Sequence, residues 1–450
     1  MVLVTVALFL WVRSYGETLS GPVSDNAETA TQPADASSIF LRVLIALTAI
    51  VVLAQILARV FAYLSQPPVI GEVAAGILLG PSLLGPDLSA LVLPPSIAPY
   101  LGVIAQLGAT LYMFLVGLEF DPGLLKQRAH TTIATSHASI LLPFLLGVIL
   151  ALFLYPRLAA GGAPFTSFAL FLGVAMSITA FPVLARILTD YRLTRTELGI
   201  MALSCAAIGD VTAWCLLAFV VGIARAEAGQ WVWVVAGALA FFALMLLLVR
   251  PLLAKFTSRW GDGKHARLVA TVLFIALLLS ALATEAIGIH ALFGAFLLGA
   301  IIPHDSAPAR AISSQLEGVV TVLLLPAFFA FTGMRTRIDL LSQPEHWLIC
   351  GLIIVVATIG KFGGSFAAAR LTGLNWRPAA ILGVLMNTRG LMELIVLNVG
   401  LDLGVVSPTL FSMMVLMALV TTSLTSPVLQ LLKVHSVAED ELKLHGAHGQ

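Results

Sequence analysis

Four ionisable residues lie inside stretches of the sequence that are otherwise apolar. Asp210 is in the segment SCAAIGDVTAW and Lys361 is in TIGKFGG, while Arg389 and Glu393 share MNTRGLMELIVLN. A charged side chain at the centre of a bilayer costs roughly 3 kcal/mol by insertion scales and needs a partner or water. A buried carboxylate such as Asp210 can hold a proton or a cation, but not both well. That competition is the chemistry of proton-coupled cation exchange.

Each of these groups also has a structural explanation. Asp210 could be a carboxylate paired with Lys or Arg, although a lone acid in a span more often marks an ion pathway. Lys361 is either an ion-pair partner or a second titrating group, and the sequence leaves both alternatives open. Arg389 and Glu393 are four residues apart, so they can pair along one helix face. Arg389 could also neutralise half-helix dipoles at a break in its span.

The composition restricts the class of protein that can carry such groups. Of the 450 residues, 59% are apolar and 10% are charged, and the net charge is +1. The mean hydropathy is +1.02. Soluble domains have roughly 25% charged residues, so a water-soluble fold is excluded. The near-neutral net charge gives no indication of a basic surface that would bind nucleic acid. The three cysteines have no CxxC spacing, so they predict no disulfide framework or zinc site, and no cofactor is expected.

The apolar stretches are long enough to cross a membrane repeatedly. A spanning helix needs roughly 20 mostly apolar residues. Thirteen stretches qualify or come close: 39–64, 69–85, 99–118, 131–155, 165–188, 197–223, 231–253, 267–287, 290–303, 318–334, 346–370, 377–400 and 408–432. The sequence therefore predicts an all-α polytopic membrane protein with a transmembrane domain at 39–432. Residues 1–38 would be an apolar segment, resembling a signal-peptide remnant, and a flexible tail. Residues 433–450 would be a short cytoplasmic tail.

The basic residues predict the orientation. If the N-terminus lies outside, sixteen Lys and Arg residues fall in inside loops and six fall outside, while Lys361 and Arg389 stay within spans. Cytoplasmic loops carry the excess of Lys and Arg. We therefore expect a multi-pass protein of the cell (inner) membrane, with its N-terminus outside and its C-terminus in the cytoplasm.

Two of the spans carry residues that interrupt a helix. The stretch 165–188 contains Ser177, Thr179 and Pro182, and proline removes a backbone hydrogen bond one turn back. The stretch 377–400 contains Asn387 and Gly390 beside the charged Arg389. Unpaired backbone at membrane depth is tolerated only against protein or a wet cavity. A break in both stretches favours an ion site over an ordinary proline kink.

The two broken spans also occupy matching places in an internal repeat. The segment AGILLG at 75–80 resembles GAFLLG at 294–299, and LVGL at 115–118 resembles FTGM at 331–334. Each pair is seven spans apart, and an odd offset inverts the second copy. Six spans, a linker span and six inverted spans are the usual construction of a secondary transporter.

Several of these motifs resemble one transporter family. QPPVIGE at 66–72 with GILLGP at 76–81, GLEFD at 117–121, SITAFP at 177–182 and MNTRGLMELIVLN at 386–398 are similar to monovalent cation:proton antiporters of the second class. That class includes NapA-type sodium antiporters, Kef-type potassium efflux systems and plant CHX exchangers. The resemblance covers roughly residues 39–432.

The resemblance implies an architecture and an ion site. Spans at 39–118 and 267–334 would form a dimerisation scaffold, spans at 131–223 and 346–432 a mobile core, and 231–253 the linker. Members are homodimers that work by elevator-like alternating access. Asp210 matches the family's ion-binding aspartate, with Thr179 and Ser177 beside it, and Lys361 matches its buried lysine. Asn387, Arg389 and Glu393 would support the crossing helices.

Two departures from the family pattern affect the expected activity. Gly209 precedes Asp210, where members usually have Asp or Asn, and this favours exchange of one cation for one proton. Only about 18 residues follow the last span, so gating by a large cytosolic domain is not expected. Na⁺ and K⁺ are not distinguished by the sequence.

Two other functions compete with antiport. A channel-like potassium efflux pathway on the same fold would conduct without moving protons, but the chain lacks a TVGYG filter. A membrane-embedded enzyme would need a nucleophile with its base or a metal-ligand cluster, and no HExxH or GxSxG motif is present. We therefore expect a secondary active transporter, with monovalent cations, protons and the lipid bilayer as partners.

Overall fold

Helices make up almost the whole of the described structure, a computed structural model that describes residues 2–17, 36–64, 66–119, 129–193, 196–225, 231–260, 266–303, 306–432 and 434. The helices of the first half are α1 (Val2–Gly16), α2 (Ala36–Tyr63), α3 (Pro68–Leu79), α4 (Pro81–Leu84), α5 (Pro86–Val92), α6 (Ala98–Glu119), α7 (Ala129–Leu158), α8 (Phe165–Ser177), α9 (Phe181–Asp190) and α10 (Glu197–Arg225). Those of the second half are α11 (Trp231–Leu244), α12 (Arg250–Trp260), α13 (Ala266–Ile287), α14 (Ala291–Ile301), α15 (Ala307–Val319), α16 (Leu325–Arg335), α17 (Pro344–Thr358), α18 (Gly364–Leu371), α19 (Trp376–Met386), α20 (Leu391–Asp402) and α21 (Pro408–Leu431). Within these residues, one isolated β-bridge joins Ala159 to Val406.

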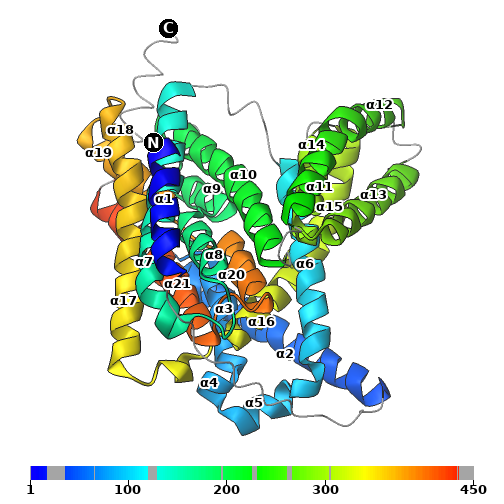
Figure 1. Ribbon diagram of the computed structural model, residues 1–450. Helices are drawn as coiled ribbons and strands as arrows, with labels where there is room; N and C mark the ends of the chain where they lie inside the picture. Colours follow the sequence, from blue (N-terminus) through cyan, green and yellow to red (C-terminus); the bar gives the residue numbers. More distant parts are fainter. Residues whose placement is uncertain are drawn as a thin grey trace.

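Short turns of other helical types connect or precede these elements. Three π-helical turns, η3 (Met245–Val249), η4 (Val320–Leu324) and η6 (Ile359–Gly363), join α11 to α12, α15 to α16 and α17 to α18. Two 3₁₀ turns, η1 (Pro95–Ile97) and η5 (Ile338–Leu341), precede α6 and follow α16. In the view of Figure 1, α11–α15 group on the right, whereas α7–α10 and α17–α21 lie on the left.

Nine helical segments in the described ranges are long and apolar enough to cross a membrane by length and composition. They are Ile39–Tyr63, Pro95–Leu118, Thr132–Leu158, Glu197–Ala224, Ala236–Phe256, Arg267–Ile287, Ala309–Leu341, Pro344–Leu371 and Pro408–Leu431. Four shorter apolar helices accompany them: α3, α8, α14 and α19. The chain is therefore a multi-pass membrane protein.

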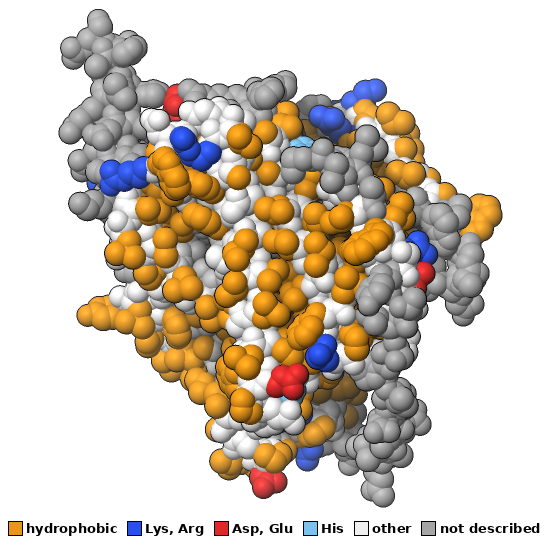
Figure 2. Space-filling model, turned by 60° about the vertical axis from the view of Figure 1, so that its left-hand side comes forward, with side chains coloured by type: hydrophobic (Ala, Val, Ile, Leu, Met, Phe, Trp, Pro, Cys, Tyr) orange, Lys and Arg blue, Asp and Glu red, His pale blue; other side chains and the backbone are white. Residues whose placement is uncertain are grey.

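The outer surface suits a lipid environment. Figure 2 shows hydrophobic side chains across most of the middle of one face, with Lys, Arg, Asp and Glu mainly towards its upper and lower ends. Large apolar side chains such as Leu348, Leu282 and Leu247 are more than half exposed. In water such a surface would be a liability, but in a bilayer it faces acyl chains of the same polarity.

The bounds of several predicted spans differ from those of the helices, and the start of the chain forms a helix of its own. The helix predicted over 69–85 ends at Leu79, because Gly80 is extended and Pro81 begins a new helix. The helix predicted over 318–334 begins earlier, at Ala307, where the Ser306 hydroxyl accepts from the amide of Ala309 as an N-cap. The apolar start of the chain forms α1, which packs against α7 and α8 and buries Val12. The flexible tail predicted over 13–38 is helical at both ends, because α1 continues to Gly16 and α2 begins at Ala36, and residues 18–35 lie outside the described residues.

Glycines let two pairs of helices approach closely in the region predicted to be the scaffold. A Cβ on Gly76 of α3 would lie 2.1 Å from the carbonyl oxygen of Ala330 on α16. A Cβ on Gly299 of α14 would lie 2.3 Å from the carbonyl oxygen of Phe114 on α6. Both distances are far below contact, so only glycine permits this packing. Each packed pair therefore combines one segment of the AGILLG and GAFLLG type, on α3 or α14, with one of the LVGL and FTGM type, on α6 or α16.

Candidate functional site

The two breaks predicted from the sequence cross each other in the structure. Between α8 and α9 the chain is extended at Ile178 and Ala180, and between α19 and α20 it leaves the helix at Asn387. The amide of Ala180 donates to the carbonyl oxygen of Thr388 at 3.0 Å. The Thr179 hydroxyl donates to the carbonyl oxygen of Met386, also at 3.0 Å. The two breaks thus satisfy part of each other's backbone, as buried polar groups require.

Asp210 faces this crossing from α10. Its side chain is buried, with 4% of its surface exposed. The backbone amide of Phe181, the first residue of α9, donates to its carboxylate. The N-terminus of a helix carries a partial positive charge, which favours an anionic group at this place. The Oδ1 atom of Asp210 has no hydrogen-bond partner among the described residues.

Other buried oxygen atoms in the same half of the molecule are also without partners among the described residues. They belong to Thr135, Ser365, Asn387 and Thr388, and to Oε1 of Glu393. These residues lie on α7, on α18, at the break before α20 and in α20 itself. Buried polar atoms in folded proteins are nearly always hydrogen-bonded. Hard cations prefer neutral and anionic oxygen ligands. The unpaired oxygens and Asp210 are therefore the right atoms for a cation or its waters.

Open space adjoins Asp210 at Gly209. A Cβ on the buried Gly209 would meet no atom within 4 Å. This contrasts with Gly76, where a Cβ would collide with a neighbouring helix. The position next to Asp210 can therefore accept a larger side chain or solvent.

Lys361 lies within electrostatic range of Asp210 but bonds elsewhere. Its side chain is fully buried in the π-turn η6, and its ammonium donates to the carbonyl oxygen of Ser139 at 3.0 Å. Asp210 and Glu393 are among the charged groups that act on it. Gly360 on the same turn allows close contact, because a Cβ there would lie 2.8 Å from Cα of Pro143 on α7. The structure thus holds a lysine near Asp210 without a direct bond to it.

Arg389 and Glu393 form a buried ion pair. Their side chains are fully buried, and Nη1 of Arg389 lies 3.0 Å from Oε2 of Glu393. The same guanidinium donates to the carbonyl oxygens of Ala175 at 3.1 Å and Met176 at 2.8 Å. These carbonyls belong to the last turn of α8, which carries partial negative charge. Arg389 therefore joins the end of one broken helix to the start of the other.

Ser177 and Thr179 lie at the break as the sequence predicts, and each donates its hydroxyl hydrogen to a carbonyl. Ser177 bonds to Val174 at 2.8 Å within α8, whereas Thr179 bonds across the crossing to Met386. Their oxygens keep lone pairs that can accept a hydrogen bond or bind a cation.

Sequence reasoning missed several hydroxyl-bearing residues around these groups. Thr422 of α21 brackets Arg389, donating to its carbonyl oxygen at 2.7 Å and accepting from its amide at 3.0 Å. Thr135 and Ser139 lie one turn apart on α7. Hydroxyl-bearing residues four apart in an apolar stretch could have indicated that these positions face the site. Such residues are, however, common in membrane helices for structural reasons.

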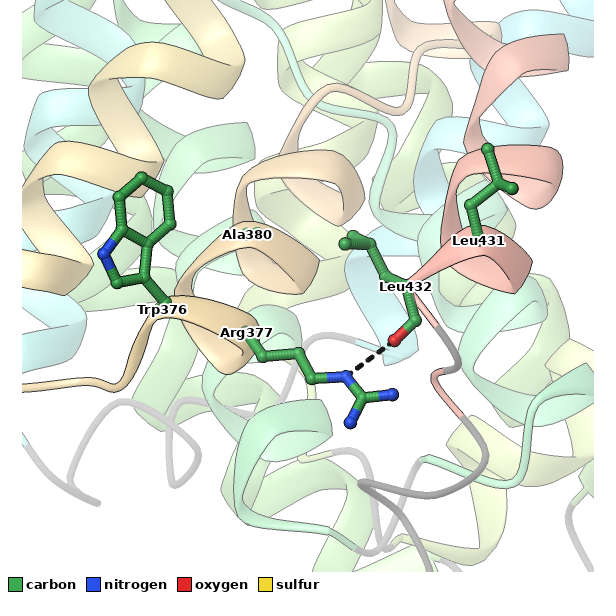
Figure 3. Close-up of a pocket in the computed structure, with 5 residues that line it drawn as sticks. All are labelled: Trp376, Arg377, Ala380, Leu431 and Leu432. Carbon is green, nitrogen blue, oxygen red and sulfur yellow. Dashed lines mark hydrogen bonds between the residues drawn. The ribbon is translucent and has the colours of Figure 1, made fainter.

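A separate cavity of about 470 Å³ lies at the other end of α19. It is lined by Trp376, Arg377, Ala380, Leu431 and Leu432, and none of the crossing residues contributes to it. Arg377 donates from Nε to the carbonyl oxygen of Leu432 at 2.8 Å (Figure 3). This bond ties the beginning of α19 to the end of α21, so it positions the broken span rather than the ion-binding atoms.

Two broken helices that cross beside a buried carboxylate, in a bundle of apolar helices, define a secondary transporter. The chain belongs to the sodium/hydrogen exchanger family, whose transmembrane-domain description matches residues 43–432. The relationship to cation:proton antiporters predicted from the motifs is thereby confirmed.

The relatives include both sodium and potassium exchangers. The chain is 43% identical to the Na⁺/H⁺ antiporter NhaS4 of Synechocystis sp. over 394 residues, which cover 86% of the chain and 96% of that protein. It is 37% identical to cation/H⁺ antiporter 19 of Arabidopsis thaliana, covering 87% of the chain and 49% of that protein. It is 35% identical to K⁺/H⁺ antiporter 1 of Saccharomyces cerevisiae, covering 82% and 44%. The chain thus spans about half the length of these plant and yeast relatives.

A solved structure shares the fold. The sodium proton antiporter MjNhaP1 of Methanocaldococcus jannaschii aligns with a TM-score of 0.63 at 16% identity. The alignment covers 89% of the chain and 98% of that structure. At this identity the likeness concerns the fold alone.

Proposed function

We propose that the protein exchanges a monovalent cation, Na⁺ or K⁺, for protons, with Asp210 alternately holding the proton and the cation. The observation that carries the proposal is the position of Asp210, which is buried beside the crossing with one carboxylate oxygen unpaired among the described residues. A cation at that oxygen would displace the proton, and a proton would displace the cation. Family membership supports antiport as the class of transport.

Thr179, Ser177 and Asn387 would supply further oxygens to the cation. Asn387 supports this role because its Oδ1 is buried at the break without a partner in the described part of the chain. Lys361 would hold positive charge near the site when the cation is absent. Arg389 and Glu393 would fix the geometry of the crossing, because they pair with each other and Arg389 also bonds the last turn of α8.

The movement we propose is an elevator-like displacement of the core, at 131–223 and 346–432, against the scaffold, at 39–118 and 267–334. The linker at 231–253 would connect them. The paired packing of α3 with α16 and of α6 with α14 supports two inverted six-helix repeats and thirteen spans. Gly209 adds no second carboxylate next to Asp210, which supports an exchange of one cation for one proton.

We further propose a homodimer in the cell (inner) membrane, with the N-terminus outside and the C-terminus in the cytoplasm. The distribution of Lys and Arg supports this orientation. In α2, only 17% of the most apolar window is buried within the chain, which leaves a long apolar face for a second copy or lipid.

Proton flux in proteoliposomes tests the function. Addition of Na⁺ or K⁺ should dissipate an imposed pH gradient with the wild-type protein, and Asp210→Asn should abolish this response. Asp87→Asn is the matched control, because it makes the same change at an exposed carboxylate in the first turn of α5. Exchange by Asp210→Asn at the wild-type rate would overturn the assignment. Cation flux that persists when pH is clamped on both sides would instead favour a channel-like potassium pathway.

A further inference from the structure

Arg335 connects a helix of the proposed scaffold to a helix of the proposed core. It is the last residue of α16, and its Nη2 lies 2.5 Å from Oδ1 of Asp402, the last residue of α20. Its Nη1 donates to Oδ1 of Asn398 at 3.0 Å. The amide nitrogen of Asn398 donates in turn to the hydroxyl of Thr332 on α16 at 2.7 Å. We call these four residues, two on each helix, the Arg335 cluster.

The Arg335 cluster differs from a simple surface ion pair. Thr332 is fully buried and Asn398 is 7% exposed, so half of the cluster lies inside the protein. Both terminal nitrogens of Arg335 donate to side chains of α20. Because the planar guanidinium group makes such paired bonds in one geometry only, they fix the register of α16 against α20. The ring of Phe331 lies below the guanidinium, with its centroid 5.3 Å away. The contact is therefore specific to one placement of α20 along α16.

Space is distributed unequally on the two sides of the crossing. On the side of the Arg335 cluster, a cavity of about 550 Å³ opens between α6, α16 and α20, and Gln106, Arg335, Asn398 and Asp402 are its polar lining. Where the start of α3 meets the crossing, near Val69, Ile70 and Gly390, the remaining void is only about 10 Å³. Of these two spaces between scaffold and core, the larger is therefore the one at the Arg335 end.

We propose that Arg335 is a positioning residue that stabilises the conformation open at its own membrane face. This inference rests on the proposed alternating access of core against scaffold. If α20 slides along α16 by several ångströms, contacts of 2.5–3.0 Å to Arg335 and Thr332 cannot persist. The cluster therefore favours one of two states, and a group that favours one state biases their populations. Because α20 begins at the crossing, a preference for one position of α20 also affects the position of the crossing beside Asp210.

A binding constant measured from one face depends on the fraction of protein that is open to that face. Removing the cluster lowers that fraction at the Arg335 face and raises it at the opposite face. Arg335→Ala should therefore raise the half-saturating cation concentration at the Arg335 face by roughly two- to fivefold. It should lower the value measured from the opposite face, with no loss of maximal rate. A purely structural role would instead reduce the maximal rate or the amount of folded protein on both faces alike.

The experiment compares right-side-out and everted membrane vesicles, each titrated with Na⁺ and with K⁺. Arg335→Ala and Asp402→Asn should shift the two half-saturating concentrations in opposite directions, and Arg335→Lys should shift them less. The double variant Arg335→Asp with Asp402→Arg should recover much of the wild-type asymmetry. Arg337→Ala is the matched control, because Arg337 pairs with Asp339 two residues away on its own segment. Equal shifts on both faces, or no shift, would overturn the inference.

A cross-link provides a second test. It does not require that the double variant with the swapped charges, Arg335→Asp with Asp402→Arg, folds. Thr332→Cys with Asn398→Cys, in a protein whose Cys205, Cys215 and Cys350 are replaced by alanine, should stop exchange on oxidation and regain it on reduction. Exchange that continues through the cross-linked protein would contradict a sliding of α20 along α16. The Asp210→Asn measurement separates the two proposals. If Asp210 is dispensable, the proposed function fails; if Asp210 is required but the Arg335 variants behave as wild type, only this inference fails.

Discussion

The guanidinium of Arg389 donates a hydrogen bond of 2.8 Å to the carbonyl oxygen of Met176, and this bond joins the ends of two half-helices that are 213 residues apart in the chain. Both residues are fully buried. A second bond to Ala175 and the ion pair with Glu393 complete the arrangement. The crossing is thus held together by a charged side chain as well as by the backbone.

The first prediction concerns the stability of this arrangement. Arg389→Ala leaves Glu393 and two carbonyls buried without a partner, so it should lower the free energy of unfolding by about 3–5 kcal/mol. Thermal unfolding in detergent would measure this. The double variant Arg389→Met with Glu393→Leu should be more stable than Arg389→Ala, because it removes the Glu393 carboxylate together with its partner. As a control, Arg157→Ala, which breaks an exposed contact of 3.8 Å with Glu345, should cost about 1 kcal/mol or less. Equal losses for the two arginines would contradict the proposed role of burial.

The second prediction concerns the space beside Asp210. Gly209→Asp should cause no steric clash at its Cβ, which would meet no atom within 4 Å. A second carboxylate adds a second proton- or cation-binding group, so the exchange should become dependent on an imposed voltage. Flux in liposomes clamped at several potentials with valinomycin would measure this. Gly209→Ala, which fills the same position without charge, should remain independent of voltage, and a voltage-dependent wild type would contradict one-for-one exchange.

The third prediction concerns helix packing. Gly76→Ala should be strongly destabilising, by about 1–3 kcal/mol or more, because its methyl group would lie 2.1 Å from the Ala330 carbonyl oxygen. Gly351→Ala on α17 is the control, since a Cβ there meets nothing within 4 Å, and it should be neutral or stabilising. The amount of monodisperse protein and its melting temperature in detergent report both effects. Tolerance of Gly76→Ala would mean that α3 and α16 can separate at little cost.

The fourth prediction concerns pH. Asp339 lies in the 3₁₀ turn η5 at the polar end of the Ala309–Leu341 segment, past the apolar residues of α16. The hydrogen bond from Arg337 lowers the pKa of its carboxyl from 3.8 to about 2, with Ser82 contributing a further bond. A depressed pKa means that the contact stabilises the fold fully above the ordinary value and is lost as pH falls through about 2. Asp339→Asn should therefore melt slightly below wild type at pH 7, and the gap should narrow between about pH 4 and 2. A difference in melting temperature that stays constant with pH would exclude the Asp339 carboxylate as its source. The group is largely exposed, so the effect should be small.

Some of these features follow from local sequence patterns. Long apolar stretches predict helices wherever they occur, since a chain in lipid must satisfy its backbone internally. Pro182 and Gly390 predict breaks, and Asp210, Lys361 and Arg389 stand out because charge in such stretches is rare. The start of α15 at Ala307 could not be predicted from the sequence pattern, because Arg310 and Glu317 give that part of the helix the polarity of a loop.

The sequence by itself determined that this chain is a helical membrane protein of the cation/proton antiporter class, which helices are broken, and which charges are buried. These properties depend on residue type and spacing along the chain. Only the tertiary structure decided which groups meet: Arg389 with the end of α8, Lys361 with Ser139 rather than Asp210, and Arg335 with α20. Side chains hundreds of residues apart have no shared local pattern. Their contacts follow from the packing angles and registers of whole helices, which glycine contacts and the crossing of the two breaks fix together.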